Sequence, residues 1–164
     1  MENKAISDTG PIIHLSEINI AEIFEVFSLV LIPEEVAKEL NKNNVAVPKK
    51  INIKKVKPEY KDKIKILINQ NSLGLGESAA IALGLQEKAN YFLTDDLDAR
   101  MASRNYGLEA HGSVGIILRA FRKKMLNKNK AIEKVIELQT KSSLFITSDL
   151  IRQTIKAIDN YKNA

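Results

Sequence analysis

The chain has 164 residues, of which 45% are hydrophobic, and it contains no cysteine. This length suits one domain with a substantial core, and the lack of cysteine excludes disulfides and thiolate metal sites. A net charge of +5 favours contact with a polyanion but is modest for a dedicated nucleic-acid-binding protein. No apolar run approaches the roughly 20 residues of a membrane span, and the N-terminus has no signal-peptide core. We therefore expect a single cytoplasmic domain over residues 1–164.

In the first two thirds of the chain, strand patterns alternate with helix patterns. A short apolar run ends at Asp8, and Pro11 then suits a first helical turn that Thr9 can cap through its hydroxyl. Strands are expected at residues 4–8, 29–32, 51–56, 91–94 and 108–110, and helices at 11–19, 20–27, 34–40, 60–69, 77–88 and 99–106. The helix at residues 77–88 is apolar almost all round and should be buried.

From Ser113 onward the pattern is helical, with helices expected at residues 114–125, 130–140 and 148–161. Thr147 or Ser148 can cap the last of these helices. The alternation before this point indicates an α/β domain with a mainly parallel sheet that is covered on both faces. The helical C-terminal region is expected to pack on the same domain.

Acidic residues are the candidates for chemistry, and Asp8 is the first of them. It stands where a strand ends, and in open α/β sheets binding sites form outside the carboxyl ends of the strands. A turn or capping role is the structural alternative for this residue. A cluster of acids from distant segments would favour a metal site, because Mg²⁺ prefers carboxylate and water oxygens and acids without a cation repel one another.

Two glutamates extend this set. Glu77 opens the buried helix, and its neighbours three and four residues on are Ala80 and Ile81, so its own face is apolar. A favourable charge at a helix N-terminus is the alternative explanation for Glu77. Glu39 borders the apolar stripe of its short helix more closely than Glu34 or Glu35, although a solvent-facing glutamate is equally compatible with this pattern.

Three aspartates follow the strand at residues 91–94. Asp96 is the first choice for a metal ligand and Asp98 the second, while Asp95 stays open as a further possibility. One of the three is expected to be a helix N-cap.

Other chemistries have weaker support in the sequence. His14 and His111 stand in settings where histidine is more often structural, so a nucleophilic triad is disfavoured. The glycines at residues 74 and 76 lack the rest of a phosphate-binding loop. An aspartyl-phosphate phosphatase is also disfavoured, because Gly10 occupies the position of its second acid.

Four segments in this order resemble the PIN domain, specifically its VapC-like prokaryotic branch. They are Ile6-Ser7-Asp8-Thr9, residues 32–40 ending in Glu39-Leu40, Gly76-Glu77-Ser78-Ala79-Ala80, and Leu93-Thr94-Asp95-Asp96-Leu97-Asp98. The resemblance covers residues 4 to 160. Glu77 departs from it, because many relatives have aspartate at this position.

The resemblance implies a three-layer α/β/α fold and a Mg²⁺- or Mn²⁺-dependent endoribonuclease. Carried over by position, the catalytic and metal-binding acids are Asp8, Glu39, Glu77 and Asp96, with Asp98 as an accessory ligand and Asp95 as an alternative to Asp96. Relatives commonly act as toxins restrained by an antitoxin protein, and they often form homodimers. The rival readings are a non-catalytic module that binds nucleic acid or a protein partner, and a DNA-directed or structure-specific nuclease.

Substrate contacts are assigned more broadly. Thr9 and Thr94 are candidates to orient a ligand or a phosphate. Phosphate contacts are expected from basic residues near the end of the helix at 114–125 and just beyond it, namely Arg119, Arg122, Lys123, Lys124, Lys128 and Lys130. A solvated helix end explains the same basic residues equally well.

Overall fold

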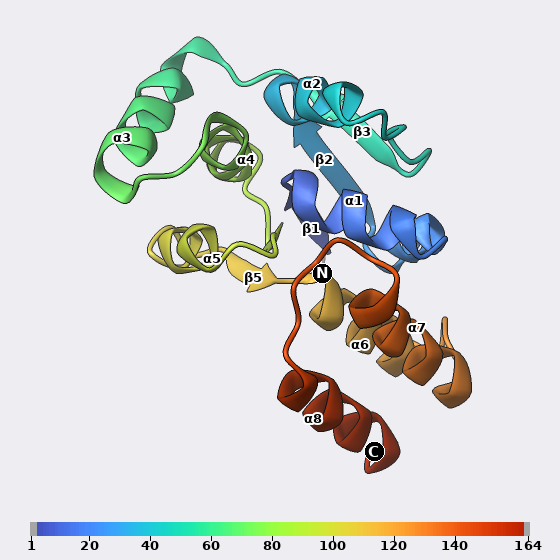
Figure 1. Cartoon of the computed structure of the whole chain (residues 1–164). Coiled ribbons are helices and arrows are strands. Elements are labelled where there is room, and N and C mark those ends of the chain that lie inside the picture. The colour runs from blue at the N-terminus through green and yellow to red at the C-terminus, as the bar shows by residue number, and fades with distance from the viewer. Residues whose placement is uncertain (1–2, 163–164) are drawn as a thin grey trace.

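The computed structural model describes residues 3–162 and contains a five-stranded sheet in the order β3-β2-β1-β4-β5 (Figure 1). Every neighbouring pair of strands is parallel. The strands are β1 (Lys4–Ser7), β2 (Leu29–Pro33), β3 (Ile51–Lys54), β4 (Tyr91–Leu93) and β5 (Glu109–His111). The parallel sheet expected from the alternating pattern is thus confirmed.

Helices cover the sheet on both sides, which gives the expected three layers. They are α1 (Thr9–Glu17), α2 (Glu34–Lys42), α3 (Lys61–Asn71), α4 (Leu75–Gln86), α5 (Leu97–Arg104), α6 (Ser113–Arg122), α7 (Lys128–Thr140) and α8 (Ser148–Asp159). Two short 3₁₀ segments are η1 (Ala21–Val26) and η2 (Pro58–Tyr60). Helices α3, α4 and α5 lie on one side, and α1, α6 and α7 on the other (Figure 1). None of the helices in residues 3–162 is long and apolar enough to cross a membrane.

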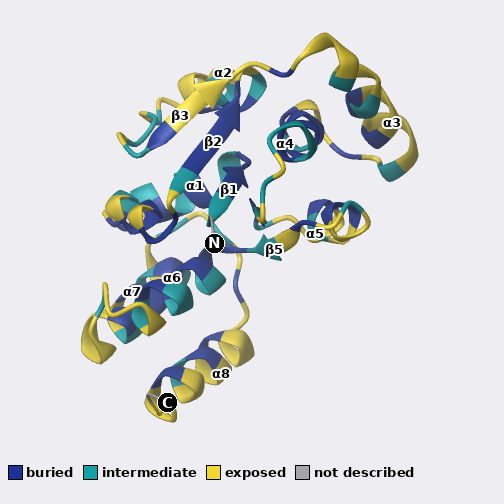
Figure 2. Cartoon of the chain, turned by 180° about the vertical axis from the view of Figure 1, so that it is seen from behind, coloured by how far each residue is buried: buried dark blue, intermediate teal, exposed yellow. Residues whose placement is uncertain are grey.

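Helix α4 is the buried helix that the sequence predicted. Its residues from Ser78 to Gly84 are all buried, and the helix contacts β1, β2 and β4 as well as α2 and α3 (Figure 2). Small alanine side chains let the helix approach the sheet closely, because close-packed interiors leave little space for larger groups. At its N-terminus only Leu75 and Glu77 escape full burial. Glu77 therefore lies at the boundary between the core and solvent.

Some local expectations need correction. Residues 21–26 form a 3₁₀ segment where an α-helix was expected. Thr9 is not the cap of α1, because the Asp8 carboxylate one position earlier accepts the hydrogen bond from the Gly10 amide. Gly107, just after α5, has the left-handed conformation with φ of 77°. Of the two caps expected for α8, Thr147 is the one that the structure shows.

The strand order reverses at β1, which lies between β2 and β4. Asp8 directly follows β1 and Thr94 directly follows β4. The ladder continues into both residues, since the Asp8 amide donates to the Leu93 carbonyl over 3.0 Å and the Thr94 amide donates to the His111 carbonyl over 2.9 Å. Ligands of open α/β sheets bind at such a switch point, at the carboxyl ends of the strands. The fold thus places Asp8 and Thr94 where a binding site is expected.

Candidate active site at the carboxyl edge of the sheet

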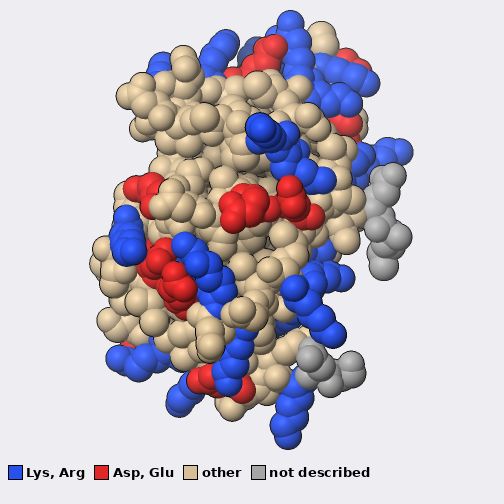
Figure 3. Space-filling view, turned by 90° about the vertical axis from the view of Figure 1, so that its right-hand side faces the viewer, with Lys and Arg blue, Asp and Glu red and all other residues tan. Residues whose placement is uncertain are grey.

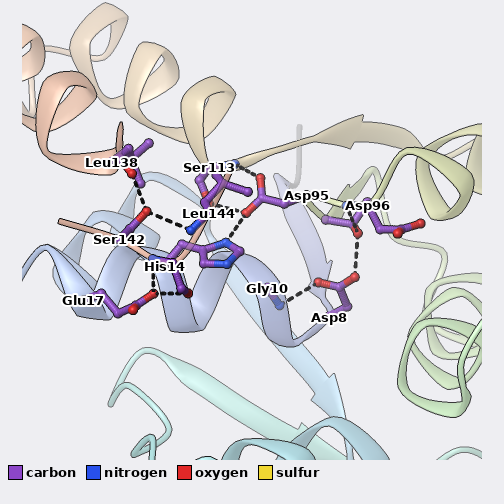
Figure 4. A network of polar contacts seen from close by, with 12 residues as sticks. Asp8, Gly10, His14, Glu17, Asp95, Asp96, Ser113, Leu138, Ser142 and Leu144 are labelled. Atoms are coloured by element: carbon purple, nitrogen blue, oxygen red, sulfur yellow. Dashed lines mark hydrogen bonds and ion pairs between the residues drawn. The ribbon is translucent and has the colours of Figure 1, made fainter. Parts of the chain in front are cut away.

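Asp8 is held on both sides of its carboxylate. Oδ1 accepts from the Gly10 amide over 3.1 Å, and Oδ2 accepts from the Thr94 hydroxyl over 2.5 Å (Figure 4). The residue is only 4% exposed. Burial raises the pKa of Asp8 to about 8, and the charges of Glu77 and Asp95 act in the same direction, while the two hydrogen bonds oppose the rise. A buried carboxylate with neighbouring acids is poised to bind a cation or a proton.

Thr94 connects Asp8 to Asp96. The hydroxyl that donates to Asp8 also accepts from the Asp96 amide over 3.2 Å. Asp96 is itself the N-cap of α5, because its Oδ1 accepts from the Ala99 amide over 2.8 Å. The Asp96 side chain is exposed. One of the three aspartates is therefore the expected cap, and its other carboxylate oxygen stays accessible to a ligand.

Glu39 reaches the same region from α2. The Thr9 hydroxyl donates to Glu39 Oε2 over 3.2 Å, so Thr9 contacts an acid of the candidate site instead of capping its helix. The Glu39 carboxylate lies directly against the backbone of Gly76, where an added Cβ would come within 2.5 Å of Oε1. Gly76 is thus needed for close approach, and this contact brings Glu39 beside the first turn of α4.

Glu77 follows Gly76 in the first turn of α4. Its Oε2 accepts from the Gly74 amide over 3.0 Å, which is the reciprocal half of a helix capping box. Partial burial raises the pKa of Glu77, and the nearby charges of Asp96, Glu39 and Asp98 add to this rise, whereas the Gly74 amide lowers it. Glu77 therefore feels the other candidate acids even though its own hydrogen bond is local.

Asp95 has a different environment from its neighbour Asp96. Its Oδ2 contacts His14 Nδ1 at 2.7 Å and accepts from the Ser113 hydroxyl at 2.6 Å, and its Oδ1 accepts from the Ser113 amide at 2.6 Å (Figure 4). Burial tends to raise the pKa of Asp95, but the hydrogen bonds from His14 and Ser113 outweigh it and hold the pKa below its usual range. Asp95 is therefore a charged residue that ties α1 and α6 to the end of β4.

A cavity of about 260 Å³ collects part of this set. Its lining includes four of the candidate acids (Asp8, Glu77, Asp95 and Asp96), together with Thr9, Gly10, His14 and Leu144. Glu39 contacts this group through Thr9 and Gly76, and Asp98 is exposed in the first turn of α5. Within residues 3–162, no group of three or more His, Asp or Glu side chains is arranged to hold a metal ion as placed. Four of the acids thus line one cavity, but they do not converge on a single point.

The donor set nevertheless has the chemistry of a hard cation site. All the candidate acids offer carboxylate oxygens. Burial raises the pKa values of Asp8 and Glu77, and repulsion from the neighbouring carboxylates raises them further. A divalent cation would relieve this repulsion. The hydrogen bonds of Glu39 and Glu77 use Oε2 in each case, so Oε1 of both side chains remains to accept a further ligand.

The basic residues expected to contact phosphate lie elsewhere. The guanidinium of Arg119 stacks on the rings of Phe27 and Tyr91, at 4.9 and 4.6 Å from the centroids. Tyr91 begins β4, so this end of α6 lies at the opposite edge of the sheet from Thr94. Arg122, Lys123 and Lys124 follow at the same end of the helix, and Lys124 lines a separate cavity with Lys128. The structure does not bring these residues together with Asp8.

Sequence reasoning assigned His14 and Ser113 no part in the site. His14 is four residues after Gly10, so one helical turn places it on the same face of α1 as the site. That spacing could have indicated that His14 lies beside the site. Ser113 carries no comparable signal, because its contact with Asp95 depends on how α6 packs against the end of β4.

A parallel sheet with helices on both faces, and with acids gathered at its switch point, defines a class of α/β proteins with an acidic site at the carboxyl edge. Residues 4–160 match the family model DUF3368, described as a PIN domain, and the chain belongs to this family. PIN domains are generally nucleases, and they typically use divalent metal ions. A search of curated proteins found no match.

Proposed function

We propose that this protein is a metal-dependent endoribonuclease whose site is formed by Asp8, Glu39, Glu77 and Asp96. The observation that carries the proposal is the burial of Asp8 among other carboxylates at the switch point of the sheet, with its pKa raised to about 8. Such an arrangement destabilises the folded chain unless a cation or protons occupy it, and this cost is expected at functional sites. Membership of a nuclease family supports the same conclusion.

Each acid has a role in this proposal. Asp8 and Asp96 would hold Mg²⁺ or Mn²⁺ directly, and Glu39 and Glu77 would bind the ion or orient water bound to it, with Asp98 as an accessory acid. The ion supplies an activated water and neutralises the scissile phosphate when it is bound. Thr94 holds the Asp8 carboxylate in one orientation, and Thr9 does the same for Glu39. The buried setting of Asp8 keeps competing water away from one side of the site.

Asp8→Asn tests the proposal with little change in shape. The variant should lose RNA cleavage by at least about a hundredfold, because it removes a charged ligand at the centre of the site. Asp62→Asn is the matched control, since Asp62 is an exposed aspartate in the first turn of α3 and belongs to neither cavity. Equal cleavage by the Asp8→Asn variant and by the wild-type chain would overturn the proposal.

Metal binding can be tested without cleavage. Mn²⁺ at about 100 times its dissociation constant should stabilise the native wild-type chain by about 2.7 kcal/mol, and this gain should disappear in Asp8→Asn. Thermal melts with Mn²⁺ and with EDTA measure the difference. A panel of single-stranded RNA, single-stranded DNA and branched substrates then separates a ribonuclease from a DNA-directed or structure-specific nuclease.

A non-catalytic binding module is the second candidate, and one observation favours it. In the described part of the chain, no three acidic or histidine side chains converge on a metal position. This arrangement is what we expect of a site that binds metal weakly. Figure 3 shows basic side chains spread over one face with acidic side chains between them, instead of one continuous basic patch. Salt-dependent RNA binding without metal-dependent cleavage, weakened by charge reversal at Lys123 and Lys124, would support this candidate.

We further propose that the nuclease acts as the toxin of a toxin–antitoxin pair. A toxin would slow growth when produced alone, and an antitoxin encoded beside it would restore growth. A homodimer is also proposed, and light scattering of the purified chain measures it directly. Growth unaffected by the wild-type chain, under conditions where it cleaves RNA in vitro, would remove the toxin role and leave the nuclease.

A further inference from the structure

A second cavity of about 460 Å³ opens beside the acidic site. Both cavities are lined by Asp95 and Leu144, so they are neighbours along the same edge of the sheet. The lining of the second cavity comes mainly from α5, β5, α6, the connection between α7 and α8, and the first turn of α8. Its lining includes Leu97, Arg100, His111, Phe145 and Leu150. The combination of apolar walls, an aromatic ring and a cation differs from the acidic cavity next to it.

Phe145 is the most exposed large hydrophobic residue of this lining. Its side chain is 89% exposed, although the loop that carries it is well anchored. Ser143 donates to the Glu17 carboxylate through its amide at 3.1 Å and its hydroxyl at 2.7 Å, and Ile146 is buried next to Phe145. The connection runs past the ends of β1 and β5 before it reaches α8 (Figure 1). An aromatic ring is thus presented to solvent from a fixed position at the mouth of the cavity.

Arg100 gives the cavity a planar cation in a fixed orientation. Its Nε donates to the Thr94 carbonyl over 3.2 Å, and its Nη2 lies 4.0 Å from Asp95 Oδ1. The guanidinium lies against the backbone of Gly112, where an added Cβ would clash with Nη2. The glycine is therefore required by this close approach. The hydrogen bond to the Thr94 carbonyl uses only the Nε donor, so the N–H groups of the two terminal nitrogens can bind a ligand.

We propose that this cavity binds a nucleobase of a single-stranded nucleic acid whose phosphate lies at the acidic site. The proposal rests on the proposed nuclease function, and it adds where the chain would hold a base. Bases stack on exposed aromatic rings and on arginine guanidinium planes, and hydrogen-bond donors of arginine bind their edges. The continuity of the two cavities at Asp95 and Leu144 would place a base and its own phosphate side by side.

The charge of the acidic cavity supports this assignment. Carboxylates around Asp8 repel a nucleic-acid strand before a cation binds, so attraction must come from neighbouring groups. The basic residues at the far end of α6 are too remote for that task, whereas Arg100 lines the second cavity and lies beside Asp95, which lines both cavities. An apolar protein segment would use Phe145 and Leu150 but would offer no acceptor to the remaining guanidinium donors of Arg100.

Phe145→Trp gives a direct test, because the chain has no tryptophan and the variant would carry a single reporter. Oligoadenylate should quench its fluorescence in EDTA, where no cleavage occurs, and an abasic oligonucleotide of equal length and charge should not. Ile136→Trp is the matched control, since Ile136 is an exposed residue of α7 outside both cavities. Quenching that is absent, or equal in the two variants, overturns the proposal.

Phe145→Ala supplies the second measurement. It should weaken binding of oligoadenylate about tenfold by anisotropy, as expected for the loss of one stacked base, and leave binding of the abasic strand unchanged. Unchanged affinity for oligoadenylate would overturn the proposal. A molar mass halved relative to the wild type in light scattering would show that the cavity is a contact between two copies of the chain. Base-dependent quenching without metal-dependent cleavage would overturn only the nuclease, and cleavage without quenching would overturn only the nucleobase cavity.

Discussion

The Thr94 hydroxyl donates a hydrogen bond of 2.5 Å to Oδ2 of Asp8, and this contact joins the ends of two neighbouring parallel strands. Both residues are buried, so the contact is shielded from water. The same hydroxyl accepts from the Asp96 amide, which couples the orientation of Asp8 to the start of α5. The hydroxyl therefore sets the direction in which a buried acid presents its remaining lone pairs.

Thr94→Val removes this hydroxyl and keeps the shape of the side chain. The hydrogen bond lowers the pKa of Asp8, so its loss should raise that pKa further and favour a proton over a metal ion. We expect Mn²⁺ affinity at neutral pH to fall by about tenfold, the effect typical of residues that orient a metal ligand. Isothermal titration calorimetry measures the change.

Thr140→Val is the control for this substitution. The Thr140 hydroxyl bonds only to the Ile136 carbonyl one turn earlier in α7, far along the chain from the site. Its removal should leave Mn²⁺ affinity unchanged. Equal affinities of the two variants would show that Thr94 does not orient a ligand.

The raised pKa of Asp8 also predicts how stability depends on pH. A carboxyl group whose folded pKa of about 8 exceeds its unfolded value of 3.8 binds its proton more tightly in the folded chain. Its contribution is fully present below pH 3.8 and is lost as the pH rises toward 8. Without metal, the wild-type melting temperature should therefore fall between pH 5 and pH 8.

Asp8→Asn should flatten this pH dependence, because the amide stays neutral throughout. At pH 8 in EDTA the variant should melt at least about 3 °C above the wild type, which corresponds to about 1 kcal/mol for a chain of this size. Differential scanning calorimetry at several pH values gives the comparison. A parallel decline of the two melting curves would contradict the assignment of the effect to Asp8.

Much of this arrangement was predictable because the hydrophobic periodicity and the composition of a segment largely determine its own secondary structure. Residues 29–32 form a continuous apolar run, as a strand buried on both faces requires, and the alanines of α4 mark a helix enclosed by other elements. The strand-end positions of Asp8 and Asp96 followed from the same reasoning. These features depend on neighbours within a few residues.

Contacts between distant segments were not predictable in the same way. The Thr9 hydroxyl has a local use as a helix cap and a distant use at Glu39, and only the packing of α1 against α2 selects the second. The contact of Arg100 with Gly112 likewise depends on how α5 packs against β5. The sequence showed which acids were available but not which distant partners would hold them.

Gly76→Ala tests the close approach of α2 and α4. An added Cβ would come within 2.5 Å of Glu39 Oε1, so the flexible Glu39 side chain must move and lose its contact with Thr9. Because alanine favours a helix over glycine, we expect little change in melting temperature but at least a tenfold loss of cleavage. Gel-based cleavage assays and thermal melts measure both quantities.

A double variant shows whether Glu39 carries this effect. If Gly76→Ala acts only through Glu39, then Gly76→Ala combined with Glu39→Ala should be no less active than Glu39→Ala alone. Additive losses would mean that the new methyl group disturbs the start of α4 by another route.

Asp95 and Asp96 are neighbours in sequence, and matched substitutions should separate their roles. Asp95→Asn replaces an acceptor-only carboxylate that binds His14 and both donors of Ser113, so the amide nitrogen would face a donor. Breaking such a buried charged network should cost about 3 kcal/mol, or about 9 °C in melting temperature.

Asp96→Asn should behave in the opposite way. Asparagine caps helices as well as aspartate does, so the bond from the Ala99 amide and the stability should be retained. The loss should instead appear in Mn²⁺ binding, because the accessible oxygen of Asp96 would lose its charge. Melting curves with EDTA and with Mn²⁺ on both variants give the answer. If Asp96→Asn kept the full Mn²⁺ shift and Asp95→Asn lost it without loss of stability in EDTA, Asp95 would be the ligand.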